Sequence, residues 1–186
     1  QMTQMPELVG LFNGFGGGAS GAIAYVELSG NSLPLSDVFV AIFSMVIGIF
    51  TFSGSLVAVM KLRGKLNNFN KKLADIFSVF LPTIIVIPAV LEMDDLLMEF
   101  IILVALIAGV IRVAVIGGAD MPVVIAFLNS LSGIAAMSAG FMVNSIILIV
   151  AGALVGASGI ILTLLMCAAM NRTLRDVLKG GFGTTT

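Results

Sequence analysis

Two asparagines, Asn13 and Asn129, lie in stretches of the chain that are apolar enough to cross a lipid bilayer. Each follows a Met-Pro dipeptide at the same distance, seven residues after Pro6 and seven after Pro122. A carboxamide in hydrocarbon costs free energy unless another polar group or water satisfies its hydrogen bonds inside the protein. Two such side chains, each at the same distance after a Met-Pro dipeptide, therefore favour a polar pathway through a membrane core.

Each of these polar side chains also has a plainer interpretation. A carboxamide between two membrane helices can make an interhelical hydrogen bond with no transport role, worth about 1 kcal/mol. The hydroxyls of Ser158 and Thr163 can bond back to carbonyls of their own helix. Both interpretations stay open from these residues alone.

Three charged residues are predicted at the ends of hydrophobic segments. Asp120 directly precedes Met121-Pro122, where an acid is either a helix N-cap favoured by the helix dipole or the partner of a cation. Arg172 and Arg175 follow the last hydrophobic segment. They are expected to act as interfacial anchors, or to pair with Asp120 or with a cytoplasmic partner domain.

The composition indicates an integral membrane protein. Of 186 residues, 59% are hydrophobic and only 10% are charged, whereas soluble domains carry about 25% charged residues. The net charge of −1 argues against nucleic acid as a partner. The single cysteine, Cys167, excludes an internal disulfide and a cysteine-rich metal site. The residue types offer no nucleophile–base set, and Gly14–Gly18 lacks the strand and polar helix of a nucleotide loop.

Hydropathy predicts an all-α membrane protein, a bundle of six transmembrane helices. A helix needs about 20 apolar residues to cross about 30 Å of hydrocarbon. The chain has six such runs, at 6–28, 36–59, 73–91, 96–116, 121–143 and 145–169. The third run contains Pro82 and Pro88, and we expect a kink there and not a break, because neighbouring groups satisfy the freed carbonyls.

Six crossings would sort the charges onto the two sides of the membrane. One side receives every basic residue: Lys61, Arg63, Lys65, Lys71, Lys72, Arg112, Arg172, Arg175 and Lys179. The other side receives acids without a base: Glu27, Asp37, Glu92, Asp94, Asp95 and Glu99. The positive-inside rule then places the N- and C-termini on the cytoplasmic side.

Small residues mark two predicted packing faces. They recur at helical spacing in the first run, at Gly10, Gly14, Gly17 and Gly21, and in the last run, at Gly152, Gly156 and Gly159. Glycine lets membrane helices approach closely. These faces have two explanations: the glycines only allow tight helix packing, or the small side chains also leave room for water beside the asparagines.

The segments 5–28 and 121–144 share the Met-Pro-Asn spacing and run in the same direction. If they are parallel repeats, Asn13 and Asn129 lie at similar depth. Transporters commonly place their sites between repeats near the midplane. A fragment of a secondary transporter is therefore the alternative function.

Several longer runs resemble a known family. They are 117–130 (GGADMPVVIAFLNS), 152–159 (GALVGASG), 166–172 (MCAAMNR) and 180–184 (GGFGT), with weaker likeness at 5–14 and 51–58. These runs are similar to the membrane domain of the beta subunit of proton-translocating nicotinamide nucleotide (NAD(P)) transhydrogenase. The likeness covers nearly the whole chain, although 65–100 matches only in hydrophobic character.

The resemblance implies a membrane enzyme that couples hydride transfer from NADH to NADP⁺ to inward proton flow. Residues 1–179 would be its transmembrane proton-channel domain, and 180–186 the start of a linker to an NADP-binding domain. NAD and NADP would bind other domains, so this chain would carry no hydride-transfer site. An alpha subunit would supply the NAD-binding domain and further helices to a dimeric enzyme. The implied location is a bacterial inner membrane in preference to a mitochondrial one.

The resemblance also implies roles for single residues. Asn13, Asn129, Ser158 and Gly159 would line the proton path. Asp120 and Arg172 would lie at its cytoplasmic mouth, facing the NADP-binding domain. Many relatives have a titrating His at the position of Asn13, and asparagine cannot bind and release a proton near neutral pH. We expect a His on an alpha-subunit helix beside Asn13; the alternative is a path through water and asparagine alone.

Overall fold

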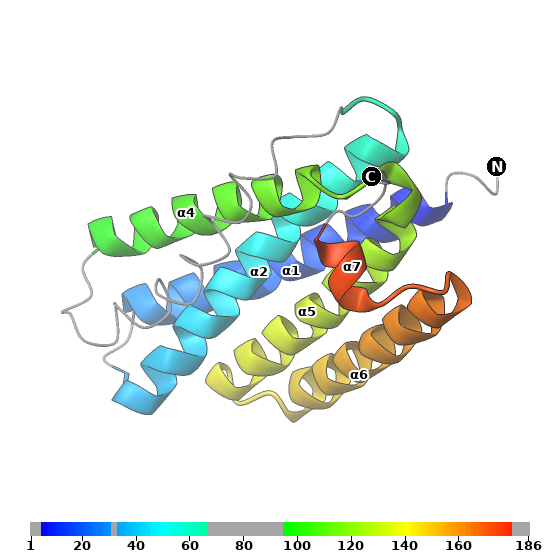
Figure 1. The fold of residues 1–186 in the computed structure, drawn as a ribbon. Helices are drawn as coiled ribbons and strands as arrows, with labels where there is room; N and C mark the ends of the chain where they lie inside the picture. Colours follow the sequence, from blue (N-terminus) through cyan, green and yellow to red (C-terminus); the bar gives the residue numbers. More distant parts are fainter. Residues whose placement is uncertain (1–4, 31–32, 67–94, 180–186) are drawn as a thin grey trace.

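The regular structure of the described residues is entirely helical. The computed structural model describes residues 5–30, 33–66 and 95–179 (Figure 1). Its helices are α1 (Met5–Gly30), α2 (Leu35–Leu62), α4 (Asp95–Ala114), the short 3-10 helix η3 (Gly118–Asp120), α5 (Met121–Met142), α6 (Ile146–Ala169) and α7 (Leu174–Leu178). The predicted all-α class is confirmed.

Five of the six predicted runs coincide with long helices, and their ends agree within three residues. The run 73–91 lies outside the described residues. Among these residues, four helical stretches are long and apolar enough to cross a membrane: α2, α4, Gly118–Met142 and α6. The 26 residues of α1 are also long enough, but its glycines and Asn13 lower its mean hydropathy.

Helices α2 and α5 form the centre of the bundle. Helix α2 packs against α1, α4 and α5, and α5 packs against α1, α2 and α6. Helices α4 and α6 lie on the outside, α4 mainly against α2 and α6 mainly against α5 (Figure 1). Each outer helix therefore buries one face within the described bundle and leaves the other uncovered by it.

The predicted glycine faces are helix contacts. Gly10, Gly14, Gly17 and Gly21 are all buried on α1. Helices α1 and α2 approach closely at Gly17 and Gly48, since a Cβ added to Gly48 would lie 2.5 Å from the Gly17 carbonyl oxygen. Gly152, Gly156 and Gly159 are likewise the buried glycines of α6. Close approach therefore sets the positions of α1 and α6 relative to the centre.

One end of the bundle collects the basic side chains. Three polar contacts join helix termini there: Glu7 to Arg63, Lys61 to the Ile116 carbonyl, and Asp120 to Arg172. This end contains all the basic residues of the described ranges, namely Lys61, Arg63, Lys65, Arg112, Arg172, Arg175 and Lys179. Among the described residues, the acids Glu27, Asp37, Asp95 and Glu99 belong to the opposite helix ends. Lys71, Lys72, Glu92 and Asp94 of the predicted charge map lie outside the described residues.

Candidate functional site

Asn13 lies in the interior of the bundle, with only 6% of its surface exposed. Its side-chain nitrogen donates to the Ser55 hydroxyl of α2 at 2.8 Å. The Ser132 hydroxyl of α5 donates to the Asn13 backbone carbonyl at 3.3 Å. The side-chain oxygen of Asn13 is buried and has no hydrogen-bond partner among the described residues. Asn13 thus joins three helices and still has one acceptor to offer.

Asn13 and Asn129 line the same cavity, of about 380 Å³, between α1, α5 and α6. The other lining residues are Val9, Phe12, Gly16, Ser132, Gly133, Ala136, Leu148, Ala151, Gly152 and Val155. A water molecule takes about 30 Å³ of liquid, so the cavity has room for several. The two asparagines and Ser132 are its amide and hydroxyl groups, which can hold water but cannot carry a proton near neutral pH.

Gly159 and Ser158 face different surroundings on α6. Gly159 packs on α5, where a Cβ would lie 2.7 Å from the Ser130 backbone nitrogen. Ser158 is exposed, and its hydroxyl donates to the Val155 carbonyl at 3.1 Å. This is the expected bond back to its own helix. Within the described bundle, Ser158 is not among the residues that line the asparagine cavity.

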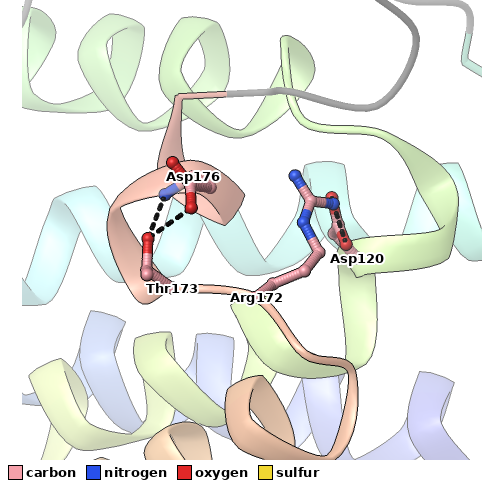
Figure 2. Close-up of polar contacts among 4 residues, drawn as sticks. All are labelled: Asp120, Arg172, Thr173 and Asp176. Carbon is pink, nitrogen blue, oxygen red and sulfur yellow. Dashed lines mark hydrogen bonds and ion pairs between the residues drawn. The ribbon is translucent and has the colours of Figure 1, made fainter.

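Asp120 and Arg172 form a buried ion pair at the basic end (Figure 2). One guanidinium nitrogen donates to both carboxylate oxygens, at 2.8 and 3.0 Å. The Asp120 side chain is fully buried, and that of Arg172 is 14% exposed. Although Asp120 occupies the N-cap position of α5, its side chain makes no cap hydrogen bond. The sequence predicts that Asp120 is either an N-cap or the partner of a cation, and in the structure it is the partner of Arg172.

Asn171 explains why Arg172 reaches Asp120. It follows the end of α6 with φ of 52°, a left-handed conformation that asparagine tolerates better than most residues. The amide of Asn171 donates to the Ala168 carbonyl, and that of Arg172 to the Cys167 carbonyl. These two bonds form a Schellman motif, which turns the chain back so that Arg172 projects toward α5.

Helix α7 continues from this turn. The Thr173 hydroxyl accepts from the Asp176 amide at 3.2 Å and so caps α7. It also donates to the Asp176 carboxylate (Figure 2). That hydrogen bond is the main reason why the pKa of Asp176 is lowered from its ordinary value. Asp176 therefore stays ionised at the basic end.

Lys61 is a buried residue of this end that lies beyond the predicted run 36–59, and the sequence predicts it only as one of the basic residues of one side. It lies in the last turn of α2, is 6% exposed, and donates to the Ile116 carbonyl. A signal was present, because Gly54, Val57, Ala58 and Lys61 follow the spacing of one helix face. All four are buried. The helix simply extends beyond the predicted run.

Comparisons with known proteins agree across the chain. A family model described as NAD(P) transhydrogenase beta subunit matches residues 1–186. An NAD(P) transhydrogenase subunit beta of Rhodospirillum rubrum is 37% identical over 198 aligned positions, covering 98% of this chain and 42% of the relative. The same protein from strain ATCC 11170 gives the same values. The chain thus spans less than half the length of these curated relatives.

Proposed function

This chain belongs to the NAD(P) transhydrogenase beta subunit family, and from that premise we propose that it is the proton-conducting part of the membrane domain. Residues 1–179 would cross a bacterial inner membrane six times, with both termini on the cytoplasmic side. Residues 180–186 would lead into an NADP-binding domain. The four apolar spans and the basic end of the bundle support this arrangement, because basic residues favour the cytoplasmic side.

The observation that carries the proposal is the cavity shared by Asn13 and Asn129. Two asparagines far apart in sequence line one cavity between α1, α5 and α6, which has room for several water molecules. Such waters would relay protons along the bundle, with the carboxamides as hydrogen-bond partners. Gly159 would keep α6 close to α5 beside Ser130. Ser158, on the outer face of α6, would join the path only through a neighbouring helix of the complex.

The titrating group would come from another subunit. The buried side-chain oxygen of Asn13 has no partner among the described residues, and a histidine ring N–H is a suitable donor for it. We expect a His on an alpha-subunit helix beside Asn13. A structure of the assembled membrane domain should place a ring nitrogen within hydrogen-bond distance of this oxygen. The same structure with no ionisable side chain beside Asn13 would contradict the expectation.

The pair of Asp120 and Arg172 would form the cytoplasmic mouth. Its buried charges would respond to the NADP-binding domain and so link proton passage to hydride transfer from NADH to NADP⁺. NAD and NADP would bind elsewhere in the complex, which would contain an alpha subunit and be dimeric. A secondary-transporter fragment is the weaker candidate, since the family match extends over the whole chain.

Replacing Asn129 tests the proposed path. In the complete enzyme in vesicles, Asn129→Leu should lower coupled proton uptake by about tenfold or more, an energetic change of at least about 1.4 kcal/mol, because a polar wall of the cavity is lost. Proton uptake is followed with a pH-sensitive dye while NADPH reduces an NAD analogue. Phe127→Leu is the control, since Phe127 lies on α5 but lines a different cavity. Unchanged proton uptake in Asn129→Leu would remove this residue from the path.

A further inference from the structure

Lys61 is a buried lysine whose side chain donates to a backbone carbonyl. The residue lies in the last turn of α2 and is 6% exposed, and its ammonium donates to the Ile116 backbone carbonyl. A buried ammonium costs free energy unless protein groups replace its hydration. The chain therefore uses a costly group to hold one point of the backbone between α4 and α5.

Ile116, whose carbonyl Lys61 contacts, is four residues before Asp120 of the ion pair. Ile116 is 1% exposed and follows the end of α4. The next residue, Gly117, caps η3, and its carbonyl accepts from the Asp120 amide at 3.0 Å. Two consecutive glycines, Gly117 and Gly118, give this connection high intrinsic freedom. A contact from outside the connection, such as the one that Lys61 makes, restricts this freedom.

We propose that Lys61 is a positioning residue for the contact between Asp120 and Arg172. By holding the Ile116 carbonyl, its ammonium orders the connection 115–120 and so sets the place of the Asp120 carboxylate. Helix α2 packs directly against η3, so the contact is part of a continuous packed region. The consequence for proton coupling rests on the proposed function, whereas the structural role does not.

Arg63 provides a matched control. It lies two residues after Lys61 at the same helix end, and it also gives a charged hydrogen bond, to Glu7 at 2.7 Å. Its side chain is 46% exposed, and its contact leads to α1 and not to the connection 115–120. Arg63→Met therefore removes a cation from the same end without touching the region that carries Asp120.

The structural role is tested by amide hydrogen exchange of the complete enzyme in lipid nanodiscs. Lys61→Met keeps the apolar stem and should make the amides of 115–121 exchange on the order of tenfold faster, a shift typical of a lost local contact. Arg63→Met should leave them unchanged. If Lys61→Met does not assemble, Lys61→Gln, which retains an N–H donor, should give a smaller increase. Unchanged or uniformly faster exchange would overturn the proposal.

A double-mutant cycle tests the functional consequence. Lys61→Met should lower coupled proton uptake by roughly tenfold, and it should have little further effect in an Asp120→Asn background, because linked residues are not additive. Fully additive losses would mean that Lys61 acts only through general stability and would overturn the proposal. If Asp120→Asn alone leaves proton uptake intact, the proposed mouth is wrong, and hydrogen exchange still decides the positioning role.

Discussion

Replacing Arg172 with methionine is expected to destabilise the protein by about 3–5 kcal/mol, the usual cost of removing one partner of a buried ion pair. The Asp120 carboxylate is fully buried and receives two hydrogen bonds from the guanidinium. Without Arg172 that carboxylate loses its cation and both bonds. Replacing Asp120 with asparagine should cost less, because Arg172 retains 14% exposure and the amide still offers an oxygen.

Thermal unfolding of purified protein in one detergent measures these differences. Variants Arg172→Met, Asp120→Asn and the double variant complete a cycle in which the double variant should be less destabilised than the sum of the two. Arg175→Met is the control, since Arg175 lies three residues further along and is exposed. Equal losses in Arg172→Met and Arg175→Met would show that the buried pair contributes nothing specific.

A methyl group at Gly133 is expected to separate α5 from α6. A Cβ there would lie 2.3 Å from the Gly156 backbone nitrogen and 2.8 Å from the Gly152 carbonyl oxygen. Backbone atoms cannot rotate away as a side chain can, so the helices must move apart. Overpacking of this kind costs about 1–3 kcal/mol. Gly133 and Gly152 also line the asparagine cavity, so its shape changes too.

Gly156→Ala is the matched control for Gly133→Ala. It adds the same methyl group to the same interface, but its Cβ would lie 3.4 Å from the Ile134 side chain and 3.5 Å from the nearest backbone atoms, which are ordinary contacts. Its unfolding temperature in detergent should therefore stay close to that of the parent, while Gly133→Ala unfolds at a lower temperature. If both variants unfold together, the crossing is looser than its backbone distances indicate.

The elements of this fold could be predicted from sequence because their signals are local. A run of apolar residues long enough for hydrocarbon predicts a helix wherever it lies in the chain, and five such runs agree with helices. Glycine spacing likewise predicted which faces of α1 and α6 are buried, since residues three and four apart share a face. For the described residues, the gathering of bases at one end follows from helix order.

The relations between helices depended on the tertiary structure. The sequence predicts a similar depth for Asn13 and Asn129 if their segments are parallel repeats, but the rotation of α1 and α5 decides that both line one cavity. Rotation of α6 likewise leaves Ser158 exposed while Gly159 is buried. These angles result from packing summed over many contacts between distant residues, and no short stretch of sequence encodes them.

The same distinction between sequence and tertiary structure applies to the charged residues at the basic end of the bundle. The residue types alone determined that Asp120, Arg172 and Lys61 lie near helix ends, since a charge is costly deeper in hydrocarbon. Only the tertiary structure decided that Asp120 pairs with Arg172 in place of capping α5, and that Lys61 is buried against Ile116. The partners are 52 and 55 residues apart, and a buried charge takes whichever partner packing brings within hydrogen-bond distance.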